Sequence, residues 1–88
     1  MRTARQARAA YLKVLGCEGI SAAWASLPRS DRDSWMAIVL AVRAEPDDTK
    51  AANAAWRTYG GPDAVAWRHL TPRFHQAWRE VVGIVRAS

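Results

Sequence analysis

The sequence predicts an all-α protein in which one helical unit of about 43 residues occurs twice. Three observations lead to this interpretation: apolar residues recur at helical spacing, the chain matches itself at a fixed offset, and turn-forming residues separate the periodic segments. No segment alternates apolar and polar residues as a half-buried strand does. We therefore expect one compact domain over residues 1–88, with the first unit at residues 3–45 and the second at residues 46–88.

The repeat is clearest in the second half of each unit. Over residues 24–44 and 67–87 the identical pairs are Trp24/Trp67, Leu27/Leu70, Trp35/Trp78, Val39/Val82, Val42/Val85, Arg43/Arg86 and Ala44/Ala87. Because tryptophan is a rare residue, two coincident tryptophan pairs favour a duplication over chance.

Each unit is predicted to hold a long helix, a short helix that carries the first tryptophan, and a second long helix. The apolar stripes at spacing i, i+3, i+4, i+7 are Ala7-Ala10-Tyr11-Val14, Trp35-Ile38-Val39-Val42, Ala52-Ala55-Trp56-Tyr59 and Trp78-Val81-Val82-Val85. The first stripes of the two units align at an offset of 45 instead of 43, which places a two-residue length difference in the glycine-containing joints at residues 16–19 and 60–61.

Turn chemistry predicts where three of the helices begin. Ser30 followed by Asp33 is similar to a capping box, and Thr71 before Pro72 places a cap ahead of a proline in the first helical position. The Pro-Asp-Asp sequence at residues 46–48 puts carboxylates near a helix N-terminus, where the helix dipole favours them. It predicts the start of the second unit.

A shared corner motif joins the last two helices of each unit. Its residues are Trp24, Leu27, Arg32 and Trp35 in the first copy and Trp67, Leu70, His75 and Trp78 in the second. The motif resembles that of small uncharacterised helical proteins of actinobacteriophages and their hosts, which implies no particular activity. The corner is also similar to the turn between the second and third helices of an HMG box, over about 12 residues per copy, which implies a shared way of building a corner.

Composition excludes several classes of protein. The chain has 88 residues and a net charge of +5, and no apolar run approaches the roughly 18 residues of a membrane span. The apolar residues 14–17 that follow the basic N-terminus are too few for an export signal, so we expect a cytoplasmic protein. One cysteine and two histidines cannot form an internal disulfide or a four-ligand zinc site. We therefore expect no cofactor.

The candidate catalytic residues lack the partner residues that catalysis requires. Neither His69 nor His75 has a nucleophile or a carboxylate at a spacing that would organise it, and Cys17 has no visible general base. His75 also aligns with Arg32, which favours a basic surface position. The sequence therefore predicts no enzymatic activity.

The five tryptophans are predicted to be structural. Trp24, Trp35, Trp67 and Trp78 recur at equivalent positions on apolar faces, and Trp56 stands where the first unit has a tyrosine. Tryptophan also serves at binding hot spots, but repetition on apolar faces favours a place in the core.

Charge is distributed unevenly along the chain. Residues 1–17 carry four bases and no acid, residues 18–48 carry three bases and six acids, and residues 49–88 carry six bases and two acids. Two basic ends around an acidic middle are typical of proteins that bind nucleic acid or an acidic partner, although excess charge also keeps small domains soluble.

The arginines lie on predicted helix surfaces, beside or opposite the apolar stripes, with Lys13 on the same face of the first helix. We therefore expect a binding module, most simply one that contacts the phosphates of duplex DNA. The candidate contact residues are Arg2, Arg5, Arg8, Arg32, Arg43, His75, Arg79 and Arg86. The alternatives are a solvated face paired with acids such as Asp31, Asp33 or Glu80, a module that binds a protein, such as a phage-encoded factor acting on a host protein, and a homodimeric domain.

Overall fold

The computed structural model describes residues 2–88, which form four α-helices and three short 3-10 turns. The helices are α1 (Arg2–Leu15), α2 (Arg29–Arg43), α3 (Asp48–Gly60) and α4 (Pro72–Ala87). The turns are η1 (Trp24–Ser26), η2 (Gly61–Asp63) and η3 (Trp67–His69). No strand occurs in these residues, so the prediction of an all-α fold is confirmed.

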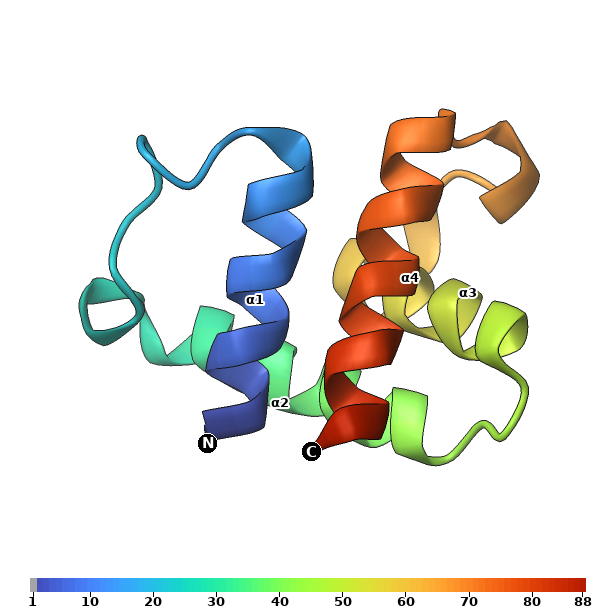
Figure 1. Ribbon diagram of the computed structural model, residues 1–88, viewed down its shortest axis with the longest axis horizontal. Coiled ribbons are helices and arrows are strands. Elements are labelled where there is room, and N and C mark those ends of the chain that lie inside the picture. Colours follow the sequence, from blue (N-terminus) through green and yellow to red (C-terminus); the bar gives the residue numbers. More distant parts are fainter. Residues whose placement is uncertain (1) are drawn as a thin grey trace.

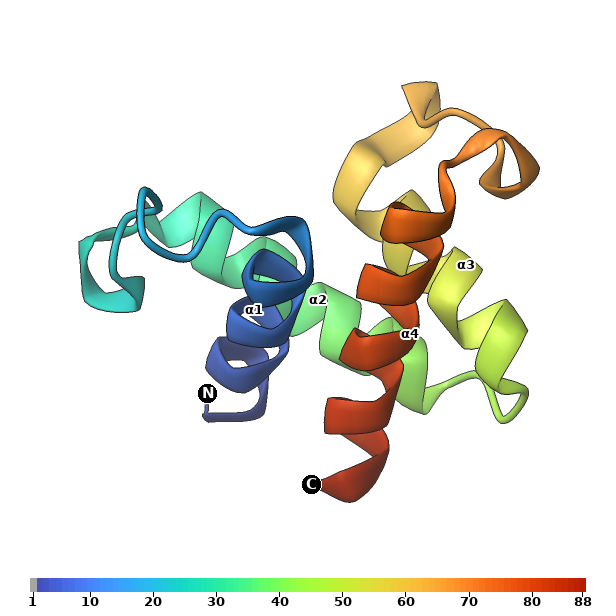
Figure 2. The same cartoon turned by 45° about the horizontal axis from the view of Figure 1, so that its top comes forward.

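The helices of the two halves of the chain pack against each other. Helix α1 makes its largest interface with α4, and α2 makes its largest interface with α3. Helices α1 and α4 run side by side in opposite directions, and the start of α1 lies at the same end of the molecule as the end of α4 (Figure 1). Helix α2 crosses behind this pair (Figure 2). The four helices therefore form one compact body.

The elements of the two halves follow the sequence offset. The turns η1 and η3 begin at Trp24 and Trp67, and α2 and α4 begin at Arg29 and Pro72, so each pair of starts is separated by 43 residues. The predicted short helix of each unit is a single 3-10 turn. The second half differs by the additional turn η2 directly after α3.

Two predicted helix starts are confirmed. The amide N–H of Lys50 donates to Oδ1 of Asp47 at 2.8 Å, so Asp47 caps α3 as the acidic joint predicts. Thr71 is the N-cap residue of α4 and Pro72 follows in the first helical position. The Thr71 side chain makes no capping hydrogen bond, and the proline ring, which fixes φ, sets this start.

The predicted capping box at Ser30 is wrong. Helix α2 begins at Arg29, with Pro28 as its extended N-cap residue, and the amide N–H groups of Asp31 and Arg32 donate to the Pro28 carbonyl at 3.1 and 3.2 Å. Ser30 thus lies inside the first turn, where its carbonyl accepts a hydrogen bond from the Ser34 hydroxyl at 3.0 Å.

Glycines end α1 and α3 as the predicted joints require. Gly16 has a φ of 72°, and the amides of Gly16 and Cys17 donate to the carbonyls of Lys13 and Leu12 at 3.1 and 2.9 Å. These two bonds form a Schellman motif. Gly61, with a φ of 74°, ends α3 in a related way.

The core follows the predicted stripes of α2 and α4. The buried residues of these helices are Trp35, Ile38, Val39, Val42, Ala77, Trp78, Val81, Val82 and Val85. Helices α1 and α3 contribute mostly alanine, namely Ala4, Ala7, Ala51, Ala52 and Ala55, together with Tyr11. These small side chains allow close approach of the larger residues on α2 and α4. Trp24, Trp56 and Trp67 are half-buried against this core.

Trp78 lies at the centre of an aromatic cluster to which all four helices contribute. Its ring centroid is 4.5 Å from that of Tyr11, 5.4 Å from Tyr59, 5.9 Å from Trp35 and 6.2 Å from Trp56. The side chain is fully buried. Such tilted and offset ring pairs add stabilisation beyond the area that they bury.

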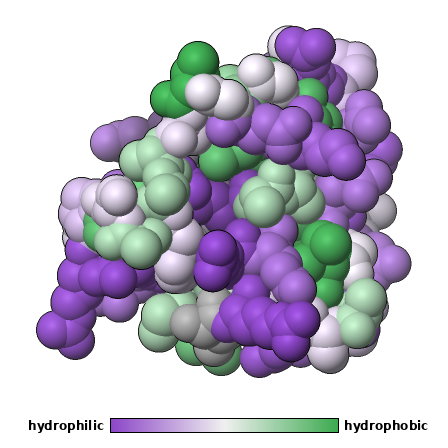
Figure 3. All heavy atoms as spheres, turned by 60° about the vertical axis from the view of Figure 1, so that its left-hand side comes forward, coloured by the Kyte–Doolittle hydropathy of each residue, from purple (hydrophilic) through white to green (hydrophobic). Residues whose placement is uncertain are grey.

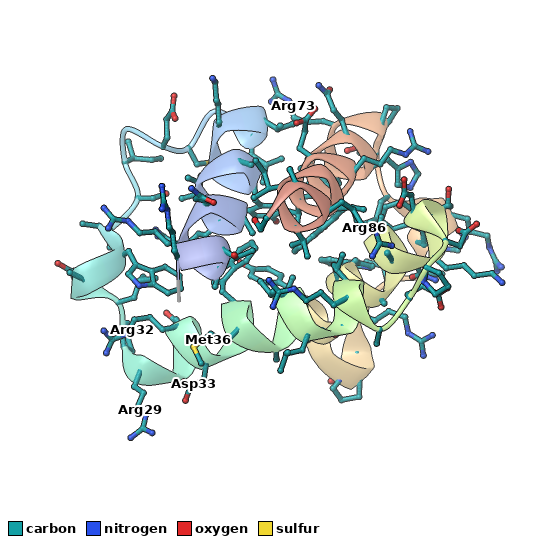
Figure 4. All side chains as sticks on the ribbon, turned by 60° about the horizontal axis from the view of Figure 1, so that its bottom comes forward. Arg29, Arg32, Asp33, Met36, Arg73 and Arg86 are labelled. Carbon is teal, nitrogen blue, oxygen red and sulfur yellow. The ribbon has the colours of Figure 1, made fainter. Side chains whose placement is uncertain are left out.

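Arg86 ties the end of α4 to the joint between α2 and α3 (Figure 4). Its Nε donates to Oδ1 of Asp48 at 3.1 Å, Nη1 donates to the carbonyl of Val42 at 3.0 Å, and Nη2 donates to the carbonyl of Glu45. The guanidinium thereby satisfies carbonyls at the end of α2 and a carboxylate at the start of α3. Its repeat equivalent, Arg43, is exposed and forms no ion pair within residues 2–88.

We expect Arg86→Ala to lower the free energy of unfolding by about 2 kcal/mol, because hydrogen bonds to charged groups contribute more than neutral ones. Arg43→Ala is the matched control and should change it by less than about 0.5 kcal/mol. Urea unfolding followed by circular dichroism measures both. Equal losses in the two variants would contradict the assigned role of Arg86.

Candidate nucleic-acid interface

Most of the basic residues have no acidic partner. Among residues 2–88 the ion pairs are Arg29–Asp33 at 3.7 Å and Arg86–Asp48 at 3.1 Å. Of the 13 lysines and arginines, 11 therefore have no carboxylate within 4.0 Å. Pairing of a surface base with a neighbouring acid is thus limited to Arg29 among these residues, because Arg86 links α4 to the joint between α2 and α3.

The basic residues of α1 face two different depressions. Arg2 and Lys13 line an open groove of about 1080 Å³ between α1 and α4. Arg5 and Arg8 line a smaller depression on the other side of α1, beneath the segment of residues 21–24. The sequence predicted a single basic face on this helix. In the structure Arg2 and Lys13 lie on one side of α1, and Arg5 and Arg8 lie on the other. Seen from the side of this segment, the surface is mainly hydrophilic with separate hydrophobic patches (Figure 3).

Only some of the other predicted contact residues share a side of the molecule with α1. Arg79 is exposed on α4, the helix that packs against α1 in the front layer of Figure 1, but it does not line the groove between these two helices. Arg73, which is not among the predicted contact residues, projects from the layer of α1 and α4, while Arg32 lies on the far side with α2 (Figure 4). Arg43 belongs to α2 as well. The repeat offset gave no signal for Arg73, because its equivalent is Ser30.

The side chains of two predicted contact residues bind other parts of the protein. Arg86 makes the contacts described above. Nε2 of His75 lies 2.6 Å from the carbonyl oxygen of Trp67, to which it donates, and the imidazole ring packs on the Trp67 indole with a centroid distance of 4.4 Å. His75 therefore stabilises the corner between η3 and α4 through its contacts with Trp67.

Three aromatic side chains line a further cavity, which we call the aromatic hollow. Tyr11, Trp35 and Tyr59 contribute to its wall, and its volume is about 590 Å³. The ring centroids of these three residues are 5.6 Å apart in every pair. Arg8 and Asp31 lie at the same hollow, from α1 and α2.

Tyr59 is the main departure from the predicted core. It ends the expected apolar stripe of α3, yet it is 46% exposed. The helix stops one residue later at Gly60, so no further turn of α3 covers the ring. The glycine pair after Tyr59 was the available sequence signal for this exposure.

The side chain of Tyr11 is only 6% exposed and lines the hollow. Burial raises the pKa of Tyr11 to about 12, and the neighbouring Tyr59 and Cys17 add smaller electrostatic contributions in the same direction. Tyr11 is therefore a neutral hydrogen-bonding group at physiological pH.

Residues 2–88 contain neither a cluster of metal-binding side chains nor a helix that could cross a membrane. No three histidine, cysteine, aspartate or glutamate side chains are grouped so that they could hold a metal ion. None of the helices combines the length and the apolar character that crossing a bilayer requires.

Comparison of the chain with protein-family models, curated proteins and solved structures finds no match. The unpaired basic residues of residues 2–88 and the aromatic hollow are the features that indicate a function.

The pKa of Tyr11 predicts a loss of stability at high pH. The folded state holds the proton to about pH 12, while the unfolded tyrosine releases it near its ordinary pKa of 10.0. The stabilisation is therefore complete below pH 10 and disappears as the pH rises from 10 to 12. Urea unfolding between pH 9 and pH 12 should show this decline, and Tyr11→Phe should show a smaller one. An identical pH dependence in both proteins would refute the assignment.

Proposed function

We propose that the protein binds nucleic acid through arginines on the layer formed by α1 and α4. The observation that carries this proposal is that α1 presents Arg2, Arg5 and Arg8 with no acid in the helix and, within residues 2–88, no carboxylate within 4.0 Å of them. Arg79 adds an unpaired charge on the adjacent helix. Guanidinium groups of this kind contact phosphate oxygens and give affinity that depends on salt and little on sequence.

The predicted contact residues then fall into three groups. Arg2, Arg5, Arg8 and Arg79 contact phosphate directly. Arg32 and Arg43 lie on α2 and contact phosphate only when the nucleic acid extends around the molecule to this helix. Arg86 and His75 act through the fold. The first ligand to test is duplex DNA, expected in the cytoplasm, because its two backbones present phosphates at a higher density than a single strand does.

A second candidate function is binding of a protein segment in the groove between α1 and α4. Its floor includes the apolar residues Ala10, Val14 and Ile84, and its rim carries both bases and acids, among them Lys13 and Glu80. A groove of this composition suits an amphipathic helix. This candidate gains weight if DNA does not bind.

The same proposal includes an origin for the fold by duplication of a unit of about 43 residues. The matched starts of η1 and η3 and of α2 and α4 support it, as do the equivalent buried positions Trp35 and Trp78. The packing of α1 on α4 and of α2 on α3 relates the two halves in a reciprocal way.

The test is fluorescence anisotropy of a labelled DNA duplex at several salt concentrations. We expect affinity to fall log-linearly with salt, and the triple variant Arg2→Ala, Arg5→Ala, Arg79→Ala to reduce the salt slope by about 3, or about one unit per lost phosphate contact.

The control removes three charges from another part of the surface. Lys50→Ala, Arg57→Ala and Arg68→Ala together lower the net charge equally, and all three residues are exposed outside the α1–α4 layer. The control should retain most of the slope. Equal losses in the two triple variants would show that net charge alone drives binding, and no binding at low salt would overturn the proposal.

A further inference from the structure

The aromatic hollow combines features that phosphate binding leaves unused. It has an exposed ring, Tyr59, beside the buried rings of Tyr11 and Trp35, whose centroids lie 5.6 Å from it. Its volume of about 590 Å³ is within the range of roughly 300–1,000 Å³ that is typical of small-ligand sites. An exposed aromatic ring in such a cavity is a surface on which a planar group can stack.

The polar groups of the hollow are available to a ligand. Tyr11 lines the hollow with a largely buried side chain, and its phenolic hydroxyl can donate or accept a hydrogen bond. Arg8 and Asp31 face the same cavity but are not within 4.0 Å of each other or of another oppositely charged group in that part of the chain. The hollow therefore offers a cation, an anion and a neutral hydroxyl around an aromatic wall.

Arg8 connects this hollow to the basic surface. It lines both the aromatic hollow and the neighbouring depression that Arg5 shares. A phosphate bound by Arg5 and Arg8 would therefore place the base of the same nucleotide close to the hollow that Tyr59 lines. Proteins that hold unpaired nucleotides combine such basic tracks with aromatic stacking surfaces.

We propose that the aromatic hollow takes one unpaired base of a nucleic acid, stacked on Tyr59, with Arg8 on its phosphate and Asp31 accepting from its exocyclic amino group. This inference rests on the proposed nucleic-acid binding and names its substrate class. A base within a duplex cannot enter the hollow, so single-stranded DNA gains a contact that duplex DNA lacks. A carboxylate acceptor favours cytosine or adenine over thymine, which has no exocyclic amino group.

The first experiment compares oligo-dC, oligo-dT and a mixed-sequence duplex of equal length by fluorescence anisotropy with the full chain. Oligo-dC should bind roughly tenfold more tightly than the duplex, in line with the contribution of one stacked base. Tyr59→Ala should remove this advantage and leave duplex binding unchanged. Asp31→Asn should reduce the preference for oligo-dC over oligo-dT. Lys50→Ala, on α3, removes a charge from an exposed site outside the hollow and should change neither.

The second experiment needs no variant. In two-dimensional NMR spectra of the wild-type protein, oligo-dC should shift the indole signal of Trp35 and the backbone signal of Ser34, which both line the hollow, and the duplex should not. Free cytidine monophosphate shares the same chemistry. If it shifts these signals and oligo-dC does not, the hollow is a nucleotide site and the source of the base is the free nucleotide.

The outcomes separate the two proposals. If the duplex binds with the expected salt dependence but oligo-dC has no advantage and Tyr59→Ala changes nothing, the hollow does not take a base while the phosphate-binding surface stands. If no nucleic acid binds at low salt, the proposed function itself fails.

Discussion

The packing of four aromatic rings around Trp78 is the constraint on which the rest of the structure depends. Tyr11, Trp35, Trp56 and Tyr59 reach Trp78 from the three other helices, with centroid distances of 4.5 to 6.2 Å. A domain of 88 residues buries a limited fraction of its surface. Large aromatic side chains at the centre, surrounded by alanines on α1 and α3, compensate by burying much apolar area with few residues. Two of these contacts, those of Trp78 with Tyr11 and with Trp35, join the two halves of the chain.

The same cluster shapes the candidate site. Trp78 contacts Tyr11, Trp35 and Tyr59, so the rings that line the hollow are supported from the core side. Because α3 ends just after Tyr59, the ring is supported on one side and open on the other. Arg86 is used to hold the α2–α3 joint, which leaves phosphate contacts to the arginines of α1 and to Arg79.

The sequence predicted local structure better than contacts between helices. The stripes of α2 and α4 and the starts at Asp47 and Thr71 could be read directly, because helical periodicity and capping act over a few residues. The use of Arg86 could not, because Asp48 and Val42 are remote in sequence and only folding brings them to it. The repeat gives no guide to this contact, because Arg43, the residue equivalent to Arg86, forms no ion pair within residues 2–88. The hollow likewise needs Arg8, Asp31 and Tyr59 from three helices.

The most direct test of this account is to prepare residues 1–45 and 46–88 as separate chains and to record circular dichroism of each alone and of the equimolar mixture. Because Trp78 in the second half packs on Tyr11 and Trp35 in the first, we predict that neither half unfolds cooperatively by itself and that mixing restores helix content and a cooperative transition. Cooperative folding of either half alone would contradict the central role of the cluster.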